Sequence, residues 1–486
     1  MAKQSKFSPW RYLVLGPLLA VVLTSCAGNQ EPRTEVPIPD AGEPELARLI
    51  EAALQDDYAY DKLAELCEAV GSRLVGSAGM DRAMAWSAES FRTAGFDSVW
   101  REPVEAPYWT RGREWARCIG PVAFDLAISG LGQSDGTGPD GIEAEILAVR
   151  DMDELEARAA EADGRIVLFN PSWEGYGKAA RHRVGGASAA ARHGAVACLV
   201  RSATGHSLGA PHTGMMRYAE DAPRIPAAAL TVEDADRLFR MCKRGLQPRV
   251  HLFMEAENHG MTTSYNVIGE IRGSRWPEQI ILAGGHLDSW DVGTGAQDDG
   301  AGVVLTLAAA RQLLQQGGRP SRTIRIVHFT SEELGGHGGR AYLETHRDEL
   351  DRHVLALESD SGSYTPLGFS VDADSTTVAR LAELARPLAW LSPGDWQVRR
   401  GGSGVDIGPI VREGVPGVGH RVEHSRYFDV HHSRADTFEK IDPEILARNV
   451  AVIAGLIHIV AEQPPGAPAT GVAERFTNDS HPDGGH

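Results

Sequence analysis

The chain has 486 residues, of which 42% are hydrophobic and 23% charged, and its formal net charge at pH 7 is -18. At roughly 100–200 residues per domain this length predicts two or three domains, and the composition excludes a small disulfide scaffold and a disordered chain. The acidic balance, without any basic run, argues against nucleic acid and anionic lipid surfaces as partners.

The first 25 residues show the pattern of a secretion signal. Basic residues precede an apolar stretch at residues 12–23, which is too short to span a bilayer. The sequence LTSC at residues 23–26 resembles the lipobox of bacterial lipoproteins, which would make Cys26 the lipidated first residue of the mature chain. Ala27 resembles an outer-membrane sorting signal. We therefore expect a cell-envelope protein, held in the outer membrane by its lipid anchor only and facing the periplasm or the exterior. An ordinary signal peptide with a chance cysteine is the alternative.

Four cysteines remain beyond the predicted anchor, an even number in what should be an oxidising compartment. They are Cys67, Cys118, Cys198 and Cys242, and none shows a metal-ligand spacing such as C-x-x-C. The sequence leaves their pairing open.

The chain after the signal divides into segments that differ in composition and in the spacing of apolar residues. Residues 26–44 are rich in Pro, Glu and Gly, as is typical of a tether. Apolar residues at helical spacing over 46–70 predict helices that end at Gly71. Residues 121–257 instead contain short strand-like runs and are typical of an inserted module. The tail, 465–486, is predicted to be disordered.

Strands and helices alternate from residue 258 onward. Strands are predicted within the insert at 166–169, 196–200, 227–230 and 250–253, and after it at 280–283, 323–329 and 354–357, with helices at 301–314 and 443–461. This alternation predicts an α/β domain, residues 45–120 and 258–464, with a mostly parallel mixed sheet covered by helices. In such sheets ligands bind beyond the carboxyl ends of the strands.

Histidine and carboxylate side chains follow the ends of these strands. They are His286 and Asp288 after the first strand, Asp298 and Asp299 before the helix, Glu332 and Glu333 after the second strand, Asp360 after the third, and His431 and His432 before the last helix. Each group alone has an ordinary explanation, such as helix capping for the aspartates or solvated charge for the glutamates. Because each acidic group follows a buried apolar run, we expect these groups to converge at one edge of the sheet, and the histidine pair before the last helix is a second source of histidine. Asp288 is placed to hold the ring N–H of His286, and one adjacent glutamate can bind a metal while the other addresses water.

These motifs resemble the metal-site motifs of the M28 zinc peptidases in order and spacing. The motifs are HLDS at 286–289, DDG at 298–300, SEE at 331–333, SD at 359–360 and HSRADT at 432–437. The strings HLDSWDVG at 286–293 and PHTG at 211–214 resemble the carboxypeptidase Q branch, the plasma glutamate carboxypeptidase-like dipeptidases. The resemblance covers residues 46–461 and implies a zinc aminopeptidase (phosphorylase/hydrolase-like) fold with a protease-associated (PA) domain at 121–257.

The resemblance also implies roles for individual residues. His286 and Asp360 would bind one of two Zn²⁺ ions, Glu333 and His432 the other, and Asp298 would bridge them. Glu332 would be the general base, and Asp288 would support catalysis beside His286. His431 would point elsewhere. The family further implies a cis peptide bond between Asp298 and Asp299.

The expected substrates are unblocked dipeptides and short peptides. A broader aminopeptidase that releases N-terminal residues is the alternative within this class, and relatives of the branch suggest a homodimer. The sequence leaves the side-chain preference open.

Two readings from other classes compete with the peptidase. Gly205 to Gly209 fits the G-x-S-x-G motif of serine hydrolases around Ser207, but Pro211 follows where a nucleophile elbow requires a helix. A receptor-like binding lipoprotein is the other reading, although a binding module has no physical use for five ligands and a base.

Overall fold

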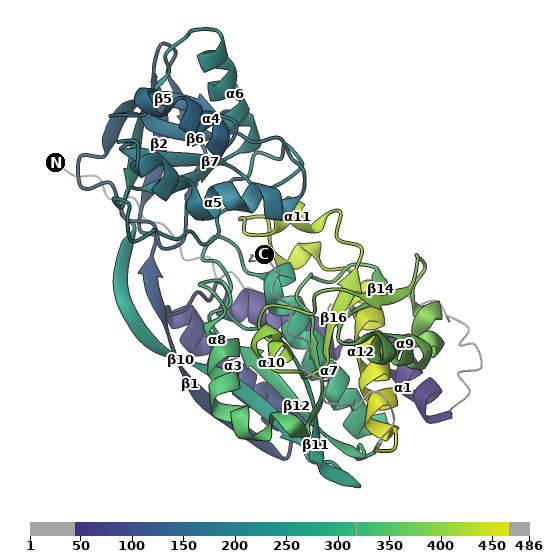
Figure 1. Cartoon of the computed structure of the whole chain (residues 1–486). Helices are drawn as coiled ribbons and strands as arrows, with labels where there is room; N and C mark the ends of the chain where they lie inside the picture. Colours follow the sequence, from purple (N-terminus) through teal and green to yellow (C-terminus); the bar gives the residue numbers. More distant parts are fainter. Residues whose placement is uncertain (1–43, 317, 466–486) are drawn as a thin grey trace, which may run out of the picture. The chain divides into compact units, whose positions relative to one another are not determined.

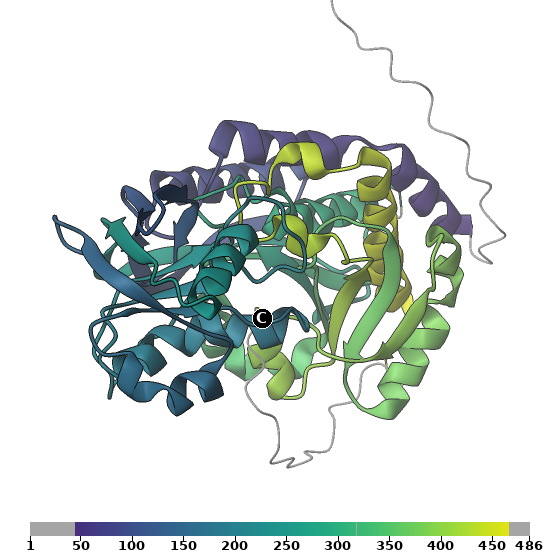
Figure 2. The same cartoon turned by 90° about the horizontal axis from the view of Figure 1, so that it is seen from above.

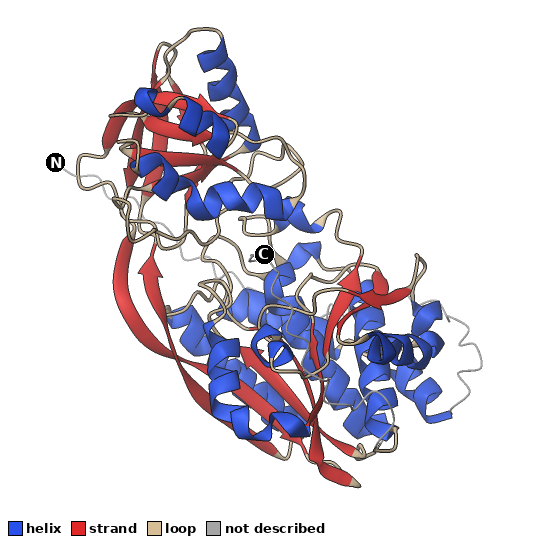
Figure 3. Cartoon of the chain, in the orientation of Figure 1, coloured by secondary structure: helices blue, strands red, loops and turns tan. Residues whose placement is uncertain are grey.

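The computed structural model describes residues 44–316 and 318–465, which form two eight-stranded sheets with helices around them (Figure 1 and Figure 3). The predicted signal, Cys26, nearly all of the tether and nearly all of the predicted tail lie outside the described residues.

The first sheet combines parallel and antiparallel strands. Its strands, in spatial order, are β1 (Ser98–Thr110), β10 (Glu257–Ile271), β12 (Arg322–Phe329), β11 (Trp276–His286), β13 (His353–Glu358), β16 (Gly417–Val422), β14 (Pro366–Asp372) and β15 (Gln397–Arg400). The central strands β12, β11, β13 and β16 pair in parallel, as does β14 with β15. The remaining three pairings are antiparallel. The mixed, mostly parallel sheet is therefore confirmed.

Helices cover both faces of this sheet. One core cluster joins it to α1 (Pro44–Gln55), α2 (Tyr58–Ala64), η1 (Glu65–Val70), α3 (Ala78–Ala94), α7 (Ala301–Gln316) and α12 (Pro443–Glu462), and a second joins the opposite face to α8 (His337–His346) and α10 (Gly408–Arg412). Figure 2 shows α12, in yellow, beside the purple N-terminal helices. Helix α12 is long and apolar enough to cross a membrane, but 83% of its apolar window is buried, as expected for a core helix.

Local signals explain where these helices begin and end. The hydroxyl of Ser77 accepts from the N–H of Met80 at the start of α3, and Asp442 caps α12 in the same way. The predicted helical run 46–70 is divided into α1, α2 and η1 and ends at Gly71, whose φ of 80° favours glycine.

The second sheet forms the inserted module. Its strands, in spatial order, are β3 (Phe124–Leu126), β2 (Glu114–Gly120), β9 (Arg249–Met254), β5 (Ile142–Val149), β6 (Ile166–Phe169), β7 (Ala197–Arg201), β8 (Ala227–Leu230) and β4 (Ile128–Gly130). Helix α6 (Val232–Lys243) packs on one face, and α4 (Met152–Ala157) and α5 (Tyr176–Ala191) pack on the other.

The boundary of the insert differs from the prediction at residue 121. Strand β2 pairs with β3 and β9, so the second sheet begins at Glu114. Gly120 and Pro121, where the predicted boundary falls, lie in the connection between β2 and β3, two strands of one sheet. The antiparallel pair β1 and β10 leads the chain out of the first sheet and back into it (Figure 1).

The four cysteines in the described part of the chain are free and form no disulfide, whereas the sequence left their pairing open. Cys67, Cys118 and Cys198 are buried, and Cys242 is half-buried.

Candidate metal centre

The predicted residues meet at the carboxyl ends of the central strands. His286 is the last residue of β11, and Asp360 lies two residues beyond β13. His286 Nε2 lies 3.1 Å from Asp298 Oδ1 and 3.6 Å from Asp360 Oδ1. These three side chains form one half of the cluster.

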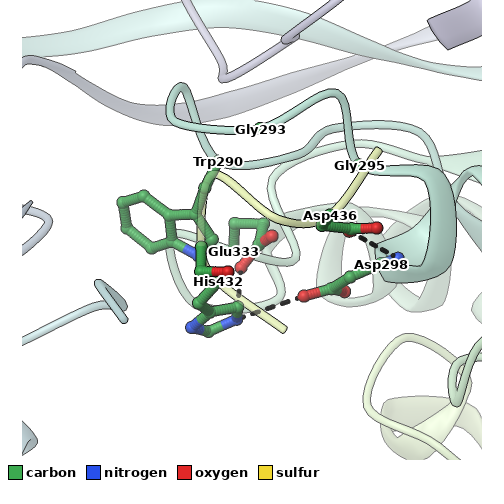
Figure 4. Close-up of a pocket in the computed structure, with 8 residues that line it drawn as sticks. Trp290, Gly293, Gly295, Asp298, Glu333, His432 and Asp436 are labelled. Carbon is green, nitrogen blue, oxygen red and sulfur yellow. Dashed lines mark hydrogen bonds and ion pairs between the residues drawn. The ribbon is translucent and has the colours of Figure 1, made fainter. Parts of the chain in front are cut away.

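The second half contains Glu333, from the turn after β12, and His432. His432 Nε2 lies 3.1 Å from Glu333 Oε2 and 3.3 Å from Asp298 Oδ2 (Figure 4). Asp298 therefore directs one carboxylate oxygen toward each half. His286, Asp298 and Glu333 also offer donor atoms that all lie within 4.8 Å of one another.

The neighbouring aspartates have different tasks. Asp299 Oδ1 accepts from the N–H of Gly302 at 3.0 Å, and its Oδ2 accepts from the N–H of His286 at 3.1 Å. Asp299 thus caps α7 and ties it to the end of β11, which leaves Asp298 for the cluster. The peptide bond between the two is cis, as the family resemblance implies.

Asp288 acts differently from the prediction. The ring Nδ1 of His286 lies 2.9 Å from the backbone carbonyl of Asp288, whereas the carboxylate Oδ1 is 3.8 Å away. The buried carboxylate instead accepts from the N–H groups of Glu332, at 3.1 Å, and Glu333, at 3.3 Å. Asp288 thus holds the backbone of both glutamates, because two N–H donors at that turn need an acceptor.

His431 also differs from the prediction. Its ring stacks on that of His432 with centroids 3.6 Å apart, and its Nε2 lies 3.5 Å from Asp298 Oδ2. The expected divergence of adjacent side chains holds for an extended strand. Here the φ of His432 is 57°, so the backbone turns and brings both rings to the same side.

Two residues whose roles the sequence did not reveal hold the loop that carries Asp298. The carboxylate of Asp436 accepts from the N–H of Gln297 at 2.8 Å and from that of Asp298 at 3.1 Å. The fully buried guanidinium of Arg73 donates to the carbonyl oxygens of Thr294, at 2.6 Å, and Gly295, at 2.9 Å. Asp436 lies in the motif HSRADT at residues 432–437, which resembles the family's, and this was the available signal for it.

The electrostatics of the cluster fit a cation. Burial, together with neighbouring carboxylates, raises the pKa of Glu333 and Asp298 and raises the pKa of Glu332 to about 8. Burial opposes protonation of His286, but Asp298 and Asp360 raise its pKa well above the usual value. Burial lowers the pKa of His432, with His431 and Arg183 adding to the effect.

The buried oxygen atoms of the cluster fit a divalent metal ion. Asp298 Oδ2 and Glu333 Oε1 are buried and have no hydrogen-bond partner among the described residues. Such oxygens are costly to bury without a partner, and a cation would supply one. All the donors are nitrogen or oxygen, which suits a catalytic metal that keeps a coordination position open.

Ser207 lies in an irregular, exposed loop, and the residues that directly follow it form no helix. The nucleophile elbow of a serine hydrolase is therefore missing at this serine.

The fold and the site define an α/β protein with a cluster of candidate metal ligands at the carboxyl edge of its mixed sheet. The sequence model of peptidase family M28 matches residues 266–457. Carboxypeptidase Q from Mus musculus is 40% identical over 83% of this chain and 85% of its own length, and the Homo sapiens protein is also 40% identical over the same shares. The chain belongs to peptidase family M28 and is a peptidase.

Solved structures agree. An M28 peptidase precursor from Shewanella amazonensis has a TM-score of 0.83 and 38% identity, covering 86% of this chain and 96% of that one. A zinc aminopeptidase from Bacillus subtilis, 22% identical, has a TM-score of 0.63 over 86% of this chain and 97% of its own, which shows the likeness of fold.

Proposed function

We propose that the protein is a two-zinc peptidase that hydrolyses unblocked dipeptides and short peptides. The observation that carries this proposal is the convergence of five side chains with nitrogen or oxygen donors, Asp298 at their centre, with Glu332 beside them. We assign His286 and Asp360 to one ion, Glu333 and His432 to the other, and Asp298 to both. The zinc aminopeptidase of similar fold supports the choice of metal.

When bound, the two ions supply the Lewis acidity that activates a water molecule and polarises the scissile carbonyl. Glu332 takes a proton from the attacking water at its carboxylate and passes it to the nitrogen of the leaving amine. Burial, together with the neighbouring carboxylates, raises the pKa of Glu332 to about 8, and cations bound beside it would favour the carboxylate form that accepts the proton. Asp288 keeps Glu332 and Glu333 in place through their backbone N–H groups.

The likeness to carboxypeptidase Q supports a substrate with a free carboxyl end, and the aminopeptidase fold supports one with a free amine. An unblocked dipeptide satisfies both conditions. A panel of one dipeptide in free, N-blocked and C-blocked forms, with longer peptides of the same sequence, tests this choice. We expect hydrolysis of the free dipeptide and loss of turnover with either block. Equal turnover of the C-blocked form and of long peptides would instead identify a broad aminopeptidase.

We also propose that the peptidase is lipid-anchored at Cys26, in the outer membrane, and that it works as a homodimer. The lipobox-like sequence at residues 23–26 supports the anchor. We further infer that the insert is a PA-like domain, which its position within the peptidase sequence supports.

A further inference from the structure

The two histidines of the metal centre are held in the same way by two different parts of the chain. His286 Nδ1 lies 2.9 Å from the carbonyl oxygen of Asp288, in its own loop. His432 Nδ1 lies 3.2 Å from the carbonyl oxygen of Thr213, which belongs to the insert. A carbonyl oxygen accepts only, so each of these contacts favours a proton on Nδ1 and leaves the Nε2 lone pair for a metal. Arg183 Nη1 also lies 3.4 Å from His432 Nδ1, but this contact is longer than the one to the Thr213 carbonyl oxygen.

The contact between Thr213 and His432 is reciprocal. The N–H of Thr213 donates to the carbonyl oxygen of His432 at 2.9 Å, so backbone and ring are both fixed by one residue. Arg183, from α5, adds a donor to the same carbonyl of Thr213 at 3.4 Å and is itself held by the hydroxyl of Tyr176 at 2.9 Å. A side chain at Gly214 would collide with the Arg183 guanidinium, so the turn requires a glycine there.

The side chain of Thr213 fixes the position of this carbonyl. Its buried hydroxyl donates to the carbonyl oxygen of Gly130, the last residue of β4, at 2.6 Å. Arg111 donates to the same Gly130 oxygen at 2.5 Å and binds both carboxylate oxygens of Asp291, at 2.7 and 2.8 Å. Asp291 lies in the loop after β11, between the proposed ligands His286 and Asp298. Arg111 and Thr213 thus join the insert to the loop after β11 at the point from which the Thr213 carbonyl contacts His432.

We propose that Thr213 is a positioning residue for the metal ion shared by His432 and Glu333, so that the insert completes the metal centre. This inference rests on the proposed two-zinc function. It predicts that removing the hydrogen bond that holds Thr213 lowers the affinity for the zinc ion at His432 and Glu333. The affinity for the ion bound through His286 should not change. Outer partners of metal-bound histidines typically change metal affinity by about 10–100-fold when they are removed.

Thr213→Val tests the inference, because it keeps the shape of the side chain and removes the hydroxyl that holds the loop. Thr213→Ser keeps the hydroxyl and serves as the rescue variant. Thr231→Val is the matched control. Thr231 is equally buried in the insert, and its hydroxyl accepts from the N–H of Asp234 to cap α6, so the control loses one hydrogen bond far from His432 in the chain.

The readout is the pair of zinc dissociation constants, measured by competition with a chelator. We expect Thr213→Val to raise one constant by about 10–100-fold and leave the other unchanged, with Thr213→Ser and Thr231→Val like the wild type. Unchanged constants in Thr213→Val, or an equal rise in Thr231→Val, would overturn the inference. If Thr213→Val does not fold, Arg111→Lys takes its place, because it loses the bidentate contact with Asp291. It must then raise the dissociation constant of the same zinc ion. The number of ions bound by the wild type tests the proposed function separately.

Discussion

The sharpest test of the site separates the adjacent glutamates Glu332 and Glu333. Both are held through their backbone by Asp288, yet only Glu333 contacts His432, at 3.1 Å. Glu332→Gln keeps the shape of the side chain and removes the base. We expect it to retain two zinc ions and its melting temperature while turnover falls by about 10²–10⁴-fold, which equals about 2.7–5.4 kcal/mol of transition-state stabilisation.

Glu333→Ala should show the opposite pattern, because it removes a proposed ligand. Zinc at about 100 times its dissociation constant stabilises a protein by about 2.7 kcal/mol, and each tenfold loss of affinity removes about 1.4 kcal/mol of that. The melting temperature should therefore fall in the presence of zinc. Without zinc it should not fall, because the variant loses a buried carboxylate whose pKa is strongly raised by burial.

The assay combines metal content by mass spectrometry, melting with and without a chelator, and turnover of one free dipeptide. If Glu332→Gln loses a zinc ion while Glu333→Ala keeps both, the two roles are reversed and the reasoning about this turn is refuted.

Three further predictions concern other parts of the chain. Ser207→Ala should keep near wild-type turnover, and a loss of about a thousandfold in a folded variant would restore the serine-hydrolase reading. Cys26→Ala should abolish detergent-dependent membrane extraction without changing turnover, and a correctly cleaved variant that still partitions into detergent would contradict lipidation. Burial lowers the pKa of His328 to about 3, so the unfolded chain takes up a proton there below pH 6.5 and stability falls on acidification. His328→Asn should reduce the slope of unfolding free energy between pH 6 and 4.5 by about 1.4 kcal/mol per pH unit, and an unchanged slope would contradict this.

The sequence predicted those parts of the fold that depend on local pattern. Strands β6 and β8 have the predicted bounds, because continuous apolar runs of this length between polar loops fit buried strands. The convergence of His286, Asp298 and Glu333 followed from the parallel strands, whose carboxyl ends share one edge. The pairing of β1 with β10 was not predicted, because long-range pairing has no local signal.

Other details of the site depend on backbone geometry that side-chain identity does not encode. Asp288 contacts His286 through its backbone carbonyl, and Thr213 contacts His432 in the same way. The turn at His432 is likewise a property of the backbone. Every residue carries these main-chain atoms, so the sequence does not mark them. The string PHTG marked Thr213 as shared with the family, but only the structure relates it to His432.

The most direct test of the central claim follows zinc content and hydrolysis of one free dipeptide together, through chelation and stepwise return of zinc. All five proposed ligands are nitrogen or oxygen donors, so we expect activity to vanish with the metal and to return fully only as two ions bind per chain. Full activity in a demonstrably metal-free sample, or complete recovery at one ion per chain, would contradict a two-zinc peptidase.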